Sequence, residues 1–418
     1  MSNIQITVHR GSHEIGGNCI ELSTGPTNIL LDIGLPLNGE GETPDVDFGN
    51  IDAVFISHAH LDHYGMLDNI DASTPVFCGE LTKQLMDATC IFRGQEPLSN
   101  NFQYVSNECK VQTGAFTITP FLVDHSGPDA YSYLIEAGGK RVFYTGDFRA
   151  HGRKAALYHR MVENPPKDID ALIIEGTTLG RQAVEVPRES DVEASMYDVM
   201  RGESGPCFML CSSQNIDRLV SAYRAAKRAG RLLVVDIYTA WILNQMAQHS
   251  DHTPTIEWPL VKVLSKGGTA AAHYVRMKDN PDVFGNFVRR LYDHNNVITE
   301  AELAEQPTKY LIKNSYIDRL LNNMDCEHAS VIYSMWDGYL EEEYNPRGYH
   351  RFEKLTNDER VNFVKIHTSG HATPDDLKAF IEANNPGKVI PVHTEQPERY
   401  ASILPADSIL LRHQKLMI

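Results

Sequence analysis

The chain has 418 residues, of which 42% are hydrophobic, 9% aromatic and 22% charged, a globular composition that excludes disordered and fibrous classes. This length exceeds one compact core of ordinary size, so we expect two domains, or one domain with a large insertion. The formal net charge of −17 opposes non-specific attraction to nucleic acid or to an anionic membrane, so any polyanion must be held locally.

The sequence indicates a cytoplasmic protein without a membrane segment. No run of 18 apolar residues occurs, and polar residues interrupt the first ten positions, where a signal peptide would carry its apolar stretch. The seven cysteines are scattered and form no CxxC pair, which is typical of reduced structural thiols.

The first part of the chain predicts a sheet-rich domain. The hairpin signature Gly138-Gly139 indicates that antiparallel strands contribute. Apolar runs predict strands at 28–34, 52–57, 116–123, 131–137, 140–145 and 170–175. Several of these strands end on polar residues of the kind that bind metals.

After Gly180 the pattern changes to alternating strands and helices, which is typical of a parallel sheet with crossover helices. We predict strands at 207–211, 232–237 and 329–334, and helices at 216–229, from 239, at 281–292 and at 299–303. The first pattern then returns from residue 362, with a helix at 374–383. We therefore expect an α/β protein whose first domain, residues 1–185 and 361–418, is split by an inserted domain, residues 186–360.

The strongest chemical signal is His58-Ala-His60-Leu-Asp62-His63. His58 and His60 are two residues apart at the end of a strand, so their side chains point to the same side and can converge on one ion. Asp62 and His63 lie past the turn and can face a second ion. This spacing predicts a two-metal site.

The remaining ligands should also follow strand ends. His125 would complete the first metal site and His393 the second. Asp147 suits the bridging position, because a carboxylate between two cations offsets their repulsion. We expect two divalent ions, zinc first and manganese as the alternative. The predicted metal ligands are His58, His60, Asp62, His63, His125, Asp147 and His393.

These motifs resemble the metallo-β-lactamase superfamily and, within it, the β-CASP nucleases, most closely the ribonuclease J family. The resemblance rests on LDIG (31–34), HAHLDH (58–63), DHSGPDAYSY (124–133), YTGDFR (144–149), LIIEG (172–176), SGHA (369–372) and PVHTE (391–395). It implies an αββα fold with an inserted β-CASP α/β domain, and hydrolysis of phosphodiesters in single-stranded RNA, with DNA as an alternative. A cleft between the domains would admit the strand.

The resemblance also implies catalytic roles. His371 would protonate the departing 3′-oxygen, and Glu175 would orient His371 or a ligand histidine. Asp62 joins these two residues in the predicted catalytic set. For Asp32, a turn-capping role and a role in orienting a ligand are equally compatible with the sequence.

A 5′-phosphate pocket would favour 5′-to-3′ exonucleolysis. The predicted pocket residues are Ser212, Ser213, Asn215, Ser369, Gly370 and His371. Two departures from the family favour an endonuclease instead: Gln214 stands where a serine is expected, and the acid Glu175 is more like that of the endonuclease that forms pre-mRNA 3′ ends. The sequence ends about 25 residues after His393, so the family's C-terminal dimerisation domain is expected to be absent, which leaves monomer and dimer open.

Two alternatives from other classes use the same fold. One is a thioester, lactone or glutathione-ester hydrolase, and the other is a non-catalytic RNA-binding subunit. His371 and the inserted domain disfavour the first, and the complete ligand set disfavours the second. A basic cluster is interpreted as a solvated helix face; its members are Arg218, Arg224, Lys227, Arg228 and Arg231.

Overall fold

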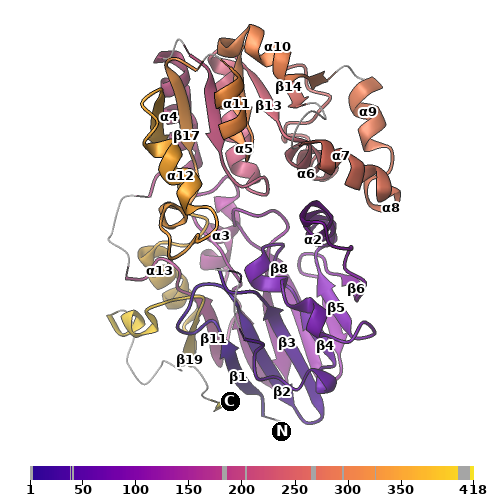
Figure 1. Ribbon diagram of the computed structural model, residues 1–418. Helices are drawn as coiled ribbons and strands as arrows, with labels where there is room; N and C mark the ends of the chain where they lie inside the picture. Colours follow the sequence, from indigo (N-terminus) through magenta and orange to yellow (C-terminus); the bar gives the residue numbers. More distant parts are fainter. Residues whose placement is uncertain are drawn as a thin grey trace. The chain divides into compact units, whose positions relative to one another are not determined.

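The computed structural model describes residues 3–37, 39, 42–180, 186–202, 205–264, 270–293, 296–324, 326–402 and 415–418 (Figure 1). The chain forms two compact units. The first comprises Met1–Met86, Leu98–Val186 and Ser369–Ile418, and the second comprises Asp87–Pro97 and Pro187–Thr368.

Two mixed sheets make up the first unit. One has the order β20 (Lys415–Met417), β1 (Gln5–Arg10), β2 (Cys19–Thr24), β3 (Thr27–Ile33), β4 (Ala53–Phe55), β5 (Pro75–Cys78) and β6 (Asn101–Tyr104). The other has the order β19 (Lys388–Val392), β11 (Ala171–Glu175), β10 (Lys140–Tyr144), β9 (Tyr131–Ala137), β8 (Phe116–Leu122) and β7 (Val111–Thr113). The hairpin predicted at Gly138-Gly139 joins β9 to β10 in antiparallel register.

The core of the first unit lies between these two sheets. Val8 and Phe55 from one sheet pack in the same buried cluster as Tyr133 and Ile173 from the other, and the rings of Phe55 and Tyr133 are 5.6 Å apart. Burial of such large apolar side chains is the main stabilising contribution to a fold. The Tyr133 hydroxyl donates to the carbonyl of Ile56 at 2.7 Å, which ties the segment before His58 to the opposite sheet.

Helices complete the sandwich. α3 (Ala155–Glu163) and α13 (Pro374–Asn384) cover the outer face of the six-stranded sheet, where Phe143, Tyr158 and Phe380 share a second buried cluster. α1 (Leu61–Tyr64) packs against β3, and α2 (Glu80–Arg93) follows β5. Short 3-10 helices lie at Phe48–Asn50, Leu67–Asn69 and Pro397–Ser402 in this unit, and at Pro307–Lys309 and Asp337–Leu340 in the second unit.

The second unit contains the parallel sheet that the alternating pattern predicts. Its order is β15 (Val297–Ile298), β14 (Val261–Leu264), β13 (Leu232–Val235), β16 (Tyr310–Lys313), β12 (Cys207–Leu210), β17 (Ala329–Tyr333) and β18 (Val361–Lys365). The second unit also contains the helices α4 (Glu189–Gly202), α5 (Ile216–Arg228), α6 (Ile237–Met246), α7 (Ala270–Asp279), α8 (Pro281–Phe284), α9 (Phe287–Asp293), α10 (Glu300–Glu305), α11 (Ile317–Asn323) and α12 (Tyr349–Thr356).

The bounds of one predicted helix and of the inserted domain differ from the sequence prediction. The helix predicted at 281–292 is broken into α8 and α9, because Gly285 adopts a φ of +52° that a continuing helix does not allow. The segment from residue 361 was expected to return to the first domain. Instead, β18 pairs in parallel with β17, so the second unit extends to Thr368.

The solvated helix face predicted for the basic cluster is wrong for Arg218 and Arg231. Arg218 is fully buried and its guanidinium lies 3.1 Å from the carboxylate of Glu189. Arg231 is also buried and donates to the backbone carbonyl of Tyr310 at 3.2 Å. Both therefore hold segments of the second unit together. The exposed members of the cluster are Arg224, Lys227 and Arg228.

Within the described part of the chain, no helix has both the length and the apolar character needed to cross a bilayer.

Candidate metal centre

The seven predicted metal ligands come together in the first unit, where loops follow the ends of strands. His58 and His60 follow β4, and α1 carries the next two ligands in the chain. His125, Asp147 and His393 follow β8, β10 and β19. The carboxyl ends of these strands therefore build one site from segments far apart in the sequence.

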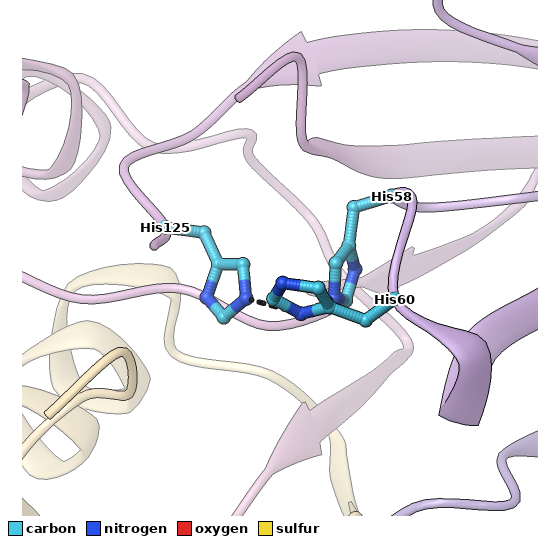
Figure 2. A group of neighbouring side chains, drawn as sticks. All are labelled: His58, His60 and His125. Carbon is cyan, nitrogen blue, oxygen red and sulfur yellow. Dashed lines mark hydrogen bonds between the residues drawn. The ribbon is translucent and has the colours of Figure 1, made fainter. Parts of the chain in front are cut away.

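The first ligand group consists of His58, His60 and His125, and Figure 2 shows their rings pointing toward one another. Nδ1 of His60 lies 2.9 Å from Nε2 of His58 and 3.2 Å from Nε2 of His125. Nδ1 of His125 lies 2.8 Å from the carbonyl oxygen of Gly370, which fixes the ring so that Nε2 faces the group.

Burial keeps the first ligand group uncharged. It lowers the pKa of His58 and His125 well below the usual value, and nearby histidines add to the effect. Burial also lowers the pKa of His60, to about 4. A divalent ion requires neutral imidazoles, so these three side chains have the protonation state of ligands at neutral pH.

The second ligand group consists of Asp62, His63 and His393. Oδ2 of Asp62 lies 3.2 Å from Nε2 of His393 and 3.9 Å from Nε2 of His63. The candidate groups overlap, since His58 and His63 also form a group with Asp147, so the division into two ion positions stays a prediction.

The Asp147 carboxylate lies near both groups. Its Oδ2 is 3.8 Å from Nε2 of His58 in the first group, and 3.2 Å and 3.8 Å from Nε2 of His63 and His393 in the second. Oδ1 of Asp147 is buried and has no hydrogen-bond partner among the described residues. Polar atoms are seldom buried without a partner, so this unsatisfied carboxylate oxygen fits a centre that takes divalent cations.

Ion pairing determines the charges of His63 and Asp147. Burial opposes a charged His63, but the carboxylates of Asp147, Asp32 and Asp62 outweigh it and raise the pKa of His63 well above its usual value. Burial likewise opposes a charged Asp147, and the histidines His393 and His63 outweigh it and hold the Asp147 pKa well below its usual range.

Asp32 contacts the predicted ligand His63 directly, which favours the orienting role over a turn-capping role. Oδ2 of Asp32 lies 2.7 Å from Nδ1 of His63 and accepts from the hydroxyl of Tyr144 at 2.5 Å. Oδ1 accepts from the backbone N–H of Ser57 at 2.7 Å. Asp32 is fully buried at a φ of +57°, a strained conformation that this network must stabilise.

Glu175, Thr177 and His371 form a layer beside the ligands. Oε1 of Glu175 lies 3.3 Å from Nδ1 of His371, as the expected orienting role requires. The Thr177 hydroxyl lies 2.6 Å from Nδ1 of His393 and 3.2 Å from Nδ1 of His371. The His371 side chain is 20% exposed, whereas those of Glu175 and His393 are 1% exposed, so His371 is the member of this layer that solvent or a substrate can reach.

Thr177 and Arg149 are residues that the sequence analysis did not single out. Thr177 follows the predicted acid by two residues, and only that proximity could have indicated it. Arg149 is fully buried, lies 3.3 Å from the Asp124 carboxylate and donates to the carbonyl of Ser369 at 3.2 Å. It thus ties the segment around His125 to the segment that carries His371.

The predicted phosphate-pocket residues belong to both units, and each half has contacts of its own. In the first unit, the Ser369 hydroxyl accepts from the backbone N–H of His371 at 3.1 Å. In the second, Asn215 caps α5 by accepting from the N–H of Arg218 at 3.1 Å, and the Ser213 hydroxyl lies 2.5 Å from Nζ of Lys313. Ser212 is exposed. The pocket as a whole stays a prediction.

Comparison with known proteins agrees with the motifs. Residues 27–200 match a family described as a beta-lactamase superfamily domain, and residues 360–401 match one described as a Zn-dependent metallo-hydrolase RNA specificity domain. The first range contains six of the seven predicted ligands, and the second contains His371 and His393.

Curated relatives carry ribonuclease names. Ribonuclease J of Helicobacter pylori strain 26695 is 23% identical over 439 residues, covering 94% of this chain and 56% of the relative. An RNase J-like protein of Methanocaldococcus jannaschii is 28% identical over 259 residues, covering 56% of this chain and 58% of the relative. The chain spans about half the length of these relatives.

A solved structure has the same fold. The crystal structure of a protein of unknown function from Enterococcus faecalis V583 aligns with a TM-score of 0.76 at 20% identity, with both chains covered completely. At this identity the likeness concerns the fold alone, and it confirms the predicted α/β architecture.

Proposed function

We propose that this chain belongs to the metallo-β-lactamase superfamily and is a metal-dependent ribonuclease, similar to ribonuclease J, that hydrolyses phosphodiester bonds of single-stranded RNA. One observation carries the proposal. His371 and His393, from the segment that matches an RNA specificity domain, lie within a few ångströms of the ligand Asp147 from the segment that matches a beta-lactamase domain. The second unit, in this proposal, is the inserted β-CASP domain.

The proposed centre holds two divalent ions, with zinc expected and manganese as the alternative. The first ligand group would hold one ion, the second ligand group the other, and Asp147 would contact both. When bound, such ions lower the pKa of a coordinated water and neutralise charge on the phosphoryl oxygens. Because Asp147 would contact both ions, each ion would have imidazole and carboxylate donors, and this mixture fits the chemistry.

His371 is the proposed general acid for the departing 3′-oxygen. Its Nδ1 is engaged by Glu175 and Thr177, so a proton delivered to the substrate would come from Nε2. The Glu175 carboxylate stabilises a protonated imidazole and fixes the plane of its ring. The partial exposure of His371 allows it to meet a substrate, whereas the predicted ligands His58, His63, His125, Asp147 and His393 are buried.

We further propose 5′-to-3′ exonucleolysis that favours a 5′-monophosphate, with weaker internal cutting. The proposal rests on the position of Ser369 and Gly370 directly before His371, where a hydroxyl and exposed backbone can hold a terminal phosphate. Gln214 and the glutamate at position 175 favour an endonuclease instead. RNA as the substrate, with DNA as the alternative, is a prediction from the same resemblance, and the cytoplasmic location is a prediction from the sequence composition.

The decisive experiment compares substrates on the metal-loaded protein. One labelled RNA is prepared with a 5′-hydroxyl, a 5′-monophosphate or a 5′-triphosphate, alongside DNA of the same sequence and a thioester. We expect mononucleotides, released fastest from the monophosphate RNA. Long internal fragments at equal rates from all three RNAs would contradict the exonuclease, and hydrolysis of the thioester alone would contradict the ribonuclease.

A further inference from the structure

A cavity of about 290 Å³ lies in the second unit, apart from the residues of the metal centre. It opens beside the carboxyl ends of β13 and β16. Residues that line it include Phe92, Arg93, Tyr238, His273, Asn314 and Tyr316. We call it the β13/β16 pocket. Its volume is at the lower end of the range for small-molecule sites, roughly 300 to 1,000 Å³, so it suits a ligand of one nucleotide in size.

The pocket lies where the order of the parallel strands reverses. β13 and β16 are neighbours, but β13 leads on to β14 on one side of the sheet, whereas β16 leads on to β17 on the other side. Right-handed crossovers then place the two following helices, α6 and α11, on opposite faces. In parallel α/β sheets, this reversal opens a crevice at the carboxyl ends of the strands, where ligands characteristically bind.

Aromatic rings line the pocket. The ring of Phe92 lies 4.7 Å from that of Tyr238 and 4.9 Å from that of His273. Tyr316 is 50% exposed, and the Arg351 guanidinium lies 5.4 Å from its ring centre. Flat aromatic surfaces of this kind stack on nucleobases without selecting one sequence.

Gln214 fixes one wall of the pocket. Its Nε2 donates to the hydroxyl of Thr89 at 3.0 Å and to that of Tyr238 at 3.1 Å, and these two hydroxyls are 3.0 Å apart. The three side chains thus hold one another in place. The residue that departs from the ribonuclease J pattern therefore supports this pocket, and its side chain is 7% exposed.

The charges favour an anion at the rim. The carboxylate of Asp236 also lines the pocket, but Lys313 donates to its Oδ2 at 2.9 Å and the N–H of Thr239 donates to its Oδ1 at 2.7 Å. Its negative charge is therefore already compensated. Burial lowers the pKa of His273, so among the described residues that line the pocket the exposed Arg93 carries the positive charge.

We propose that the β13/β16 pocket binds a single nucleotide, with its base against the aromatic walls and its phosphate at Arg93. The inference goes beyond the ribonuclease proposal and does not depend on it, because none of the residues that carry it belongs to the metal centre. The same chemistry is offered by a free mononucleotide and by one nucleotide of an RNA strand, so the test includes both.

The test is isothermal titration of the full chain, as purified, with AMP, adenosine, inorganic phosphate and a five-residue oligonucleotide with hydrolysis-resistant phosphorothioate linkages. We expect one AMP per chain, bound more tightly than adenosine or phosphate. Arg93→Ala should weaken AMP about tenfold and leave adenosine unchanged, because only the phosphate contact is lost. Tyr316→Ala should weaken both about fivefold or more, because stacking is lost.

Matched controls are Arg224→Ala and Tyr292→Ala, which remove an exposed arginine and an exposed tyrosine elsewhere in the second unit. Both should bind AMP like the parent protein. If the oligonucleotide competes with AMP and its binding falls with the same variants, the source is a strand; if it does not, the source is a free nucleotide. AMP binding that survives Arg93→Ala and Tyr316→Ala but disappears with a chelator would place AMP at the metal centre and overturn the proposal, as would no binding of AMP.

Discussion

The Asp32 carboxylate lies 2.7 Å from Nδ1 of His63, on the side of the ring opposite to Asp147, whose Oδ2 is 3.2 Å from Nε2. His63 is thus held between two carboxylates. Asp32 orients the ring, and Asp147 would contact the same proposed ion as His63. Contacts of this type fix the tautomer of a ligand and raise its basicity.

Asp32→Asn should therefore weaken the second ion. The Asp32 carboxylate accepts hydrogen bonds from Ser57, His63 and Tyr144, and an asparagine amide, with one oxygen in place of two, cannot accept all of them. Asparagine tolerates the positive φ of this position. We expect a 10- to 100-fold lower affinity for one ion and little change for the other. Metal content after dialysis against graded chelator measures this, with the exposed Asp68→Asn as the control. Equal loss of both ions would contradict the assignment.

Asp147→Ala should weaken both ions and remove most ribonuclease activity, because this carboxylate lies near a histidine of each ligand group. Elemental analysis of the purified variant gives the number of ions per chain, and circular dichroism checks that the fold is kept. A variant that retains two ions and full turnover would show that Asp147 is not the bridge.

His371→Ala should slow RNA cleavage by about 10² to 10⁴, the range for a positioned general acid, and leave metal content unchanged. Metal content separates a general acid from a metal ligand. The measurement is needed because Nδ1 of His371 is 3.7 Å from Oδ2 of Asp147, close enough for a direct metal role. Loss of an ion together with activity would make His371 a ligand.

Thr177→Val should lower both metal retention and cleavage. Valine has the shape of threonine but lacks the hydroxyl that lies 2.6 Å from Nδ1 of His393, so the ring loses the partner that turns Nε2 toward Asp62. We expect about tenfold weaker binding of the second ion. Thr177→Ser keeps the hydroxyl and should restore both properties; failure of this rescue would mean that the methyl group, and therefore packing, is what matters.

Strand periodicity and local motif spacing located the main strands and the residues that cluster after their ends, but they did not locate the contacts that surround these residues. Whether the clustered residues bind metal stays a prediction. The partner of His393 is Thr177, 216 positions away, and such pairings depend on strand order, which a single sequence does not specify. Arg218 was misplaced for the same reason: α5 is buried on most sides, so a charged residue on it meets Glu189 and not solvent.

Binding of the second ion should release a proton from His63. The raised pKa of His63 means that the metal-free protein carries a proton there at neutral pH, and an ion must displace it. The first ligand group is already neutral, since burial lowers the pKa of its histidines, that of His60 to about 4. Affinity for the second ion should therefore fall about tenfold for each pH unit below the His63 pKa, whereas affinity for the first should stay level down to about pH 5.

Titration of zinc into the metal-free protein, in two buffers with different ionisation enthalpies, counts these protons. We expect one proton released with the second ion and none with the first at pH 7. His63→Ala should abolish the release, while Asp68→Asn should leave it unchanged. Equal proton release with both ions, or affinities that fall in parallel as the pH is lowered, would mean that His63 is neutral before metal arrives and that its two carboxylate neighbours do not hold it in the charged form.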